Sequence, residues 1–236
     1  MPPRIRDLLP MYILVFSSAI LLTLHTNRAV TAFSSIPRSG TVIILDAGHG
    51  GEDGGAISCT GADEAHINLQ ITQRLNDLLH LLGYDAKMLR TDNTDLHTEG
   101  KTISQRKNSD LLQRTKIINE TAGGLLISIH QNHFPDGRYS GAQVFWADTD
   151  GSKKLAEDMQ HMFVATLNPG SKRSAKQASG IYVMEHIKCT GVLVECGFLS
   201  NPTEEALLRS EKYQKQISAV VAVSVCRHIA LQTPSA

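Results

Sequence analysis

Four side chains in this sequence have the types and positions needed to bind a metal ion and use it in hydrolysis. His49, His130 and Glu195 each lie at or just after the end of an apolar run. Glu64 opens a helical pattern that follows a glycine-rich stretch. Catalytic zinc takes three protein ligands, drawn from imidazole nitrogen and carboxylate oxygen, and keeps a water in the fourth position. Two histidines and one carboxylate satisfy this requirement, and a second carboxylate can pass a proton from the water to a leaving amine.

Each of these residues also has a purely structural explanation. A glutamate in the first turn of a helix, as at Glu64, is favoured by the helix dipole. His49 could belong to a glycine-rich turn whose amides bind an anion, and His130 could be hydrogen-bonded into the core. Glu195 is harder to explain in this way, because an unpaired carboxylate in an apolar run costs several kcal/mol to bury. The residue types alone leave open which carboxylate would bind the metal.

Alternating strand and helix patterns must position these residues. Short apolar runs rich in β-branched residues predict strands, and apolar residues at helical spacing predict helices. The predicted strands are residues 41–46, 86–90, 125–130, 142–147, 181–184 and 191–195. The predicted helices are residues 67–82, 104–119, 152–167 and 213–231, with a helical turn starting at Pro202 and a polar loop over residues 171–177. This alternation predicts a single α/β domain with a mostly parallel twisted sheet flanked by helices, with the candidate residues at the carboxyl ends of its strands.

The first 32 residues differ in character from the rest of the chain. Arg4 and Arg6 precede residues 8–24, which carry no charge, and Val30-Thr31-Ala32 offers a small-residue cleavage site. This pattern is typical of a secretory signal, and its length is close to that of the shortest membrane-spanning helix. We therefore expect residues 1–32 to be a cleaved signal peptide or a membrane anchor, residues 33–40 a short linker and residues 41–236 the catalytic domain. The chain is expected to act outside the cytoplasmic membrane and to touch that membrane only through residues 1–32.

Composition excludes several classes of protein. With 42% hydrophobic and 19% charged residues, the chain can bury a core, which excludes a disordered chain. Lys+Arg and Asp+Glu both number 23, and aromatic residues make up 5%, so we expect no nucleic-acid partner. The four cysteines form no CxxC pair, which argues against a cysteine zinc site and favours free thiols, although two disulfides would be feasible outside the cytoplasm. They are Cys59, Cys189, Cys196 and Cys226.

Four segments carry a resemblance to a known family. They are residues 45–51 (LDAGHGG), Glu64 with Asn68, residues 128–132 (SIHQN) and residues 192–202 (VLVECGFLSNP). In this order they resemble the zinc-dependent N-acetylmuramoyl-L-alanine amidases of the Amidase_3 type, over residues 41–231.

The resemblance implies a role for each candidate residue. His49, Glu64 and His130 would be the ligands of one zinc ion per chain, and Glu195 would be the catalytic carboxylate. The implied reaction is hydrolysis of the amide between N-acetylmuramic acid and the L-alanine of the stem peptide in peptidoglycan. Residues that bind the rest of the substrate are not identified by the motifs.

A narrower resemblance concerns residues 95–114 and 141–143, which are similar to the germination-specific, spore-cortex branch of the family. Members of that branch remove stem peptides so that muramic-δ-lactam can form. This resemblance implies that the protein acts in the forespore or cortex. It also allows an accessory protein in the spore as a partner. The alternatives are a vegetative cell-wall autolysin, a zinc peptidase acting on other peptides and a catalytically silent wall-binding protein. Retention of all four candidate residues argues against the last of these.

Three positions depart from the family pattern, and two arginines outside the four segments match it. Ala47, Ala65 and Gln131 differ from the residues that the family often has, and we expect these departures to affect substrate details rather than the metal. Arg90 and Arg114 match arginines of the family, and we expect them to form surface or structural ion pairs.

Overall fold

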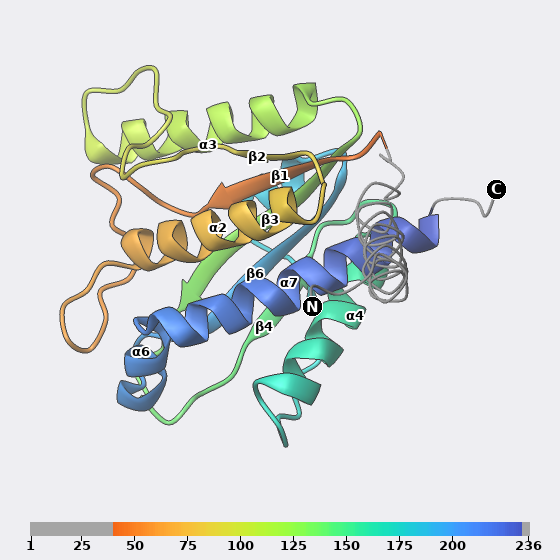
Figure 1. Ribbon diagram of the computed structural model, residues 1–236. Helices are drawn as coiled ribbons and strands as arrows, with labels where there is room; N and C mark the ends of the chain where they lie inside the picture. Colours follow the sequence, from red (N-terminus) through yellow and green to blue (C-terminus); the bar gives the residue numbers. More distant parts are fainter. Residues whose placement is uncertain (1–39, 233–236) are drawn as a thin grey trace, which may run out of the picture. The chain divides into compact units, whose positions relative to one another are not determined.

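A six-stranded sheet forms the centre of the computed structural model, which describes residues 40–232 (Figure 1). The strands are β1 (Val42–Ala47), β2 (Ala86–Met88), β3 (Gly124–Asn132), β4 (Gln143–Trp146), β5 (Lys176–Gln177) and β6 (Thr190–Phe198). Their order across the sheet is β2-β1-β3-β6-β4-β5. β4 runs antiparallel to β6, and all the other neighbouring strands are parallel. The prediction of a mostly parallel sheet is therefore confirmed.

Helices cover both faces of this sheet. They are α2 (Glu64–Leu81), α3 (Ile103–Glu120), α4 (Ser152–Thr166), α5 (Tyr182–His186), α6 (Pro202–Leu208) and α7 (Glu211–Gln232). α2, α4 and α7 bury their apolar residues against one face, whereas α3 and α5 cover the other. Figure 1 shows α3 on the opposite side of the strands from α7 and α4. The predicted α/β domain with flanking helices is thus confirmed for residues 40–232.

The hydrophobic pattern explains both kinds of element. β1, β3 and β6 are almost continuously apolar because helices cover them on both sides, as parallel strands require. In α2 the buried residues Ile67, Ile71, Leu75 and Leu79 recur every four positions, so they share one face of the helix. Gly83, with φ of 83°, follows the end of this helix in the left-handed conformation that commonly stops one.

The structure corrects two predictions about the second half of the chain. Residues 181–184 were expected to form a strand but contribute to the short helix α5. Helical spacing puts Val183 and Ile187 on one face, where both are buried in the core beside α3. Conversely, the expected loop over residues 171–177 ends in the two-residue edge strand β5, which pairs with β4. The sequence of β5 has no hydrophobic pattern that would predict a strand.

None of the helices within residues 40–232 combines the length and the apolar character needed to cross a membrane. The signal peptide or anchor expected at residues 1–32, and all of the linker except its last residue, lie outside the described residues. Their assignment stays a prediction.

A buried ion pair joins the end of β1 to α3. Arg114 of α3 donates to Asp46 of β1, and its Nε donates to Asp110 at 2.7 Å. Asp46 also accepts a hydrogen bond of 2.6 Å from the Ser128 hydroxyl on β3. Burial alone would raise the pKa of Asp46, but the charge of Arg114, with smaller contributions from His130 and Ser128, holds it below its usual value. Asp46 is therefore an ionised carboxylate inside the protein, and its removal leaves a buried cation undercompensated.

We expect Asp46→Asn to lower the free energy of unfolding by about 3 kcal/mol, because it breaks a buried ion pair and leaves Asp110 as the remaining carboxylate partner of Arg114. Urea denaturation of the full chain measures this change. The matched control is Asp77→Asn on the exposed face of α2, which should stay within about 0.5 kcal/mol of the parent. Equal stability of the Asp46 and Asp77 variants would contradict the structural role of the pair.

The same pair makes stability depend on pH in a defined direction. Because the pKa of Asp46 is lower in the folded than in the unfolded chain, its contribution is complete above about pH 5 and is lost as the pH falls through and below 3.8. The difference in unfolding free energy between the parent and Asp46→Asn should therefore be constant near neutrality and shrink in acid. A difference that stays constant down to about pH 2 would show that Asp46 is not held ionised by its surroundings.

Candidate metal centre

Three of the predicted site residues meet at one edge of the sheet. His49 follows β1, His130 lies near the end of β3 and Glu64 is the first residue of α2. The Nε2 atom of His49 lies 3.3 Å from Oε2 of Glu64, and Nδ1 of His130 lies 3.1 Å from Oε1 of the same carboxylate. One ligand atom from each residue lies within 4.8 Å of the others, so the group can hold a metal ion.

Glycines allow this close approach. A Cβ atom on Gly48 would overlap the His130 imidazole, and one on Gly55 would lie 2.6 Å from Oε2 of Glu64. His49 itself has a φ of 62°, and within residues 40–232 no other non-glycine residue has a positive φ. Such a conformation is uncommon for a histidine and persists only where the surroundings impose it. The loop after β1 is therefore built to present the His49 imidazole.

Asp53 orients His49. Its Oδ2 atom lies 2.9 Å from Nδ1 of His49, which leaves Nε2 facing Glu64. A carboxylate on the far nitrogen of an imidazole fixes the ring and its tautomer, as is usual for metal-binding histidines. Burial alone would lower the pKa of His49, but the hydrogen bonds to Asp53 and Glu64 outweigh it and raise this pKa to about 9. The sequence analysis did not single out Asp53, although its position four residues after His49 in the glycine loop is a usable signal.

The Glu64 carboxylate is held ionised by its neighbours. It accepts hydrogen bonds from the backbone N–H groups of Ala56 at 2.9 Å and Gln131 at 3.0 Å, and from the Asn68 amide at 3.1 Å. Burial alone would raise the pKa of Glu64, but His130 and His49 keep it far below its usual value. A buried carboxylate in this state is a strong ligand for a divalent cation.

Gln131 contacts two of the residues around the candidate metal centre. It is one of the positions that depart from the family pattern, and we expected such positions to affect the substrate rather than the metal. In the structure its backbone N–H bonds to Glu64, and its side-chain amide donates to Oδ1 of Asn68 at 3.0 Å. The Gln131 side chain therefore contacts Asn68, whose amide in turn donates a hydrogen bond to the Glu64 carboxylate.

Glu195 has an environment opposite to that of Glu64. It lies on β6 directly across from His130 on β3. Its Oε2 atom is buried and has no hydrogen-bond partner among residues 40–232. Burial, reinforced by the charge of Glu64 and opposed by His130 and His49, raises the pKa of Glu195 to about 7. This carboxyl can exchange a proton near neutral pH, which is what a general acid or base requires.

Two buried arginines hold the loop that carries His49. Arg90 donates to the carbonyl oxygens of Ala47 at 2.8 Å and Gly48 at 3.0 Å. Arg114 donates to Ala47 at 3.0 Å and to the carbonyl oxygen of His49 at 2.8 Å. The expectation of ion pairing is confirmed for Arg114, whose pairs are buried, but the hydrogen bonds of Arg90 go to backbone carbonyl oxygens. Sequence patterns do not distinguish an arginine that binds carbonyl oxygens from one on the surface.

The cysteines play no part in this centre. All four are free thiols, as expected. Cys196, the neighbour of Glu195, is fully buried in the core cluster under α2, α4 and α7. Cys196 faces away from Glu195, since successive side chains of a strand point to opposite faces.

Known proteins resemble the chain over most of its length. Residues 43–227 match the N-acetylmuramoyl-L-alanine amidase family. The germination-specific N-acetylmuramoyl-L-alanine amidase of Bacillus subtilis (strain 168) is 40% identical over 196 residues, which cover 82% of this chain and 82% of the relative. A probable cell wall amidase of Staphylococcus aureus, LytH, is 28% identical over 205 residues and is longer, with 62% of its length covered.

Two solved amidases share the fold. The CwlD amidase of Clostridioides difficile, in complex with the GerS lipoprotein, has a TM-score of 0.78 at 35% identity, covering 81% of this chain and 100% of that one. An N-acetylmuramoyl-L-alanine amidase from Clostridium difficile 630 has a TM-score of 0.71 at 28% identity, covering 82% of this chain and 98% of that one. With a family match that spans most of the α/β domain and a relative at 40% identity, the chain belongs to the N-acetylmuramoyl-L-alanine amidase family.

Proposed function

We propose that this amidase holds one zinc ion with His49, Glu64 and His130 and uses Glu195 as its catalytic carboxylate. The single observation that supports this assignment most strongly is the convergence of two imidazoles on one ionised carboxylate at the sheet edge. Imidazole nitrogen and carboxylate oxygen are ligands that zinc prefers, and the three together leave a position for water. The proposed ligand set therefore fits zinc by its chemistry.

Different residues of the chain have different roles in the proposed amide hydrolysis. Zinc, when bound, supplies a Lewis acid and lowers the pKa of water from 15.7 to about 7. Glu195 takes a proton from the attacking water and delivers it to the nitrogen of the leaving L-alanine. The water oxygen becomes part of the lactyl carboxylate of N-acetylmuramic acid, the carbon–nitrogen bond breaks, and the stem peptide leaves with a free amino terminus. Asp53 keeps the His49 ring in place throughout.

The names of the relatives support a proposal for the cellular setting. We propose that the chain removes stem peptides from spore-cortex peptidoglycan, outside the cytoplasmic membrane, as the name of the germination-specific relative from Bacillus subtilis suggests. The CwlD amidase of Clostridioides difficile is solved with the GerS lipoprotein, which supports an accessory lipoprotein as a partner here as well. Export would depend on residues 1–32.

We expect the full chain to bind about one zinc per molecule, because a single group of three ligands forms a mononuclear site. Metal analysis after reconstitution and dialysis measures the ratio. His49→Ala should weaken zinc binding by more than about 100-fold, since loss of a ligand costs at least as much as loss of its outer hydrogen bonds. His66→Ala, on the exposed side of α2, is the matched control and should bind zinc as the parent does. Zinc-free parent protein after reconstitution would refute the proposed centre.

We expect Glu195→Gln to keep its zinc and lose turnover by about 10²- to 10⁴-fold, because the amide cannot accept the proton of water. Mass spectrometry of digested peptidoglycan measures the loss and checks the products, which should be intact stem peptides with an N-terminal alanine. Glu157→Gln on the exposed face of α4 serves as the control. Parent-like activity of the Glu195 variant would exclude it as the proton carrier, and cleavage within the peptide would indicate a peptidase instead.

A further inference from the structure

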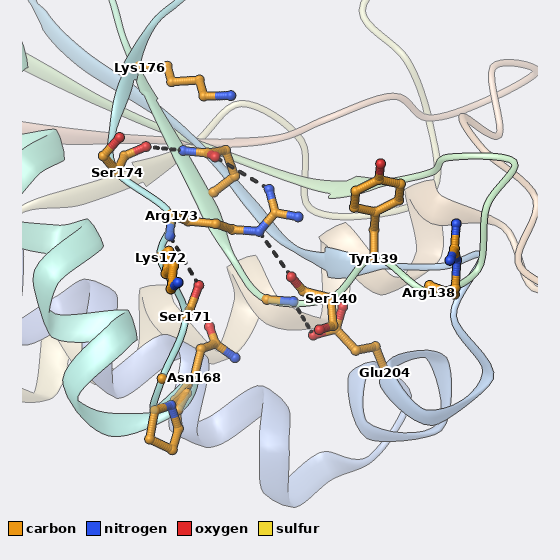
Figure 2. A pocket seen from close by; sticks show the side chains of 15 residues that line it. Arg138, Tyr139, Ser140, Asn168, Ser171, Lys172, Arg173, Ser174, Lys176 and Glu204 are labelled. Atoms are coloured by element: carbon orange, nitrogen blue, oxygen red, sulfur yellow. Dashed lines mark hydrogen bonds between the residues drawn. The ribbon is translucent and has the colours of Figure 1, made fainter.

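A cavity lies beyond Glu195 along the edge of the sheet that carries the candidate metal centre. Its volume is about 790 Å³. Gln143, which lines it, is the residue of β4 directly opposite Glu195 of β6. The rest of its wall comes from the segment before β4, the segment that runs from the end of α4 into β5, and Glu204 of α6. Figure 2 shows the side chains of these segments around one space.

The charged residues that line this cavity are mostly basic. Four basic residues border it, Arg138, Lys172, Arg173 and Lys176, together with the single carboxylate of Glu204. Arg138 is paired with Asp136 at 2.5 Å. The other three form no ion pair with any residue in the described range 40–232. The cavity therefore carries positive charge that the protein itself does not neutralise.

Both oxygens of the Glu204 carboxylate accept hydrogen bonds from the backbone. Its Oε1 atom accepts from the N–H of Gly141 at 2.8 Å, and its Oε2 atom accepts from the N–H of Phe198 at 2.8 Å. Arg173 lies near enough for its charge to act on this carboxylate, but not within ion-pair distance. Glu204 therefore lines the cavity without forming an ion pair with its basic residues, which stay available to an anion from outside.

Arg173 is fixed in position before any ligand arrives. Its Nε atom donates to the carbonyl oxygen of Ser140 at 3.0 Å, and its guanidinium carbon lies 4.8 Å from the centre of the Phe198 ring. Figure 2 shows the side chain reaching toward Ser140 from the segment that also carries Lys172 and Lys176. Its Nη2 atom has no hydrogen-bond acceptor among the described residues, so it is free to bind an external carboxylate. A preorganised guanidinium loses little entropy on binding.

The distance from the candidate metal centre suits a peptide. Neighbouring strands lie about 4.8 Å apart, so the two steps from β3 through β6 to β4 span about 10 Å. An extended peptide covers about 3.3 to 3.6 Å per residue, and three residues therefore span about the same distance. A peptide chain that begins beside His130 and follows this edge of the sheet therefore reaches β4, where Gln143 lines the cavity, at about its third residue.

We propose that this cavity binds a carboxylate of the stem peptide, about three residues from the amide that is cleaved, and so orients the substrate. The proposal rests on the proposed amidase function, because it takes the stem peptide as the ligand. Arg173 forms the fixed half of the site, and Lys172 and Lys176 add charge at its rim. These residues select a substrate with an anionic end and leave the chemical step to the metal centre.

The test compares two substrates that differ only in that carboxylate. They are N-acetylmuramoyl-L-alanyl-D-isoglutaminyl-L-lysine with a free C-terminal carboxylate and the same compound as its C-terminal amide. With the zinc-loaded full chain, we expect KM for the acid to be about tenfold lower than for the amide, the usual effect of one charge-assisted hydrogen bond. Arg173→Gln and the double variant Lys172→Gln/Lys176→Gln should each raise KM for the acid toward that of the amide, and change KM for the amide little.

A charge-matched variant and a binding measurement separate the possible outcomes. Lys87→Gln/Lys212→Gln removes two exposed charges outside the cavity and should keep the parent's preference. Calorimetry measures the binding of the free tripeptide acid and of its amide, and it requires no turnover. An inactive parent would therefore refute the amidase proposal, whereas its preference for the carboxylate could still be measured. Equal binding of acid and amide by the parent, or an equal loss in the Lys87/Lys212 variant, would overturn the inference.

Discussion

The site depends on the hydrogen bonds that two buried arginines donate to the backbone carbonyl oxygens at the end of β1 and just after it. Arg90 and Arg114 both bind the carbonyl oxygen of Ala47, and between them they also bind those of Gly48 and His49. A buried guanidinium is stable only when its donors are satisfied, so the two side chains and the loop fix one another. This arrangement holds His49 in a left-handed conformation that a free loop would rarely adopt.

The sheet supplies the second constraint. Parallel strands β1, β3 and β6 end at a common edge, which brings the loop after β1, His130 and Glu195 to the same place. The antiparallel strand β4 begins where β6 reaches Glu195, so the edge continues past the proposed catalytic residues to the basic cavity. The proposed metal centre and the proposed binding region for the stem peptide thus lie along one edge of the sheet.

Two glutamates at this edge differ in protonation because their surroundings differ. Glu64 receives two backbone N–H groups and the Asn68 amide, and it remains ionised in spite of its burial. Glu195 has a buried oxygen without a partner in residues 40–232, and its pKa rises to about 7. Carboxylates whose pKa values are pushed apart by their environments suit separate roles, which agrees with the proposal that Glu64 binds the metal ion and Glu195 moves a proton.

The sequence by itself determined the α/β alternation, the candidate residues at the strand ends and the family, because hydrophobic periodicity and short motifs are local properties of the chain. It predicted a strand at residues 181–184 and missed β5, since neither the burial of Val183 beside Ile187 nor the pairing of Lys176 with Phe145 is visible locally. Only the tertiary structure decided that Arg90 and Arg114 are buried on the loop of His49, that Asp53 orients this ring and that the basic residues around Arg173 enclose a cavity. These features depend on contacts between segments far apart in sequence, which no local pattern records.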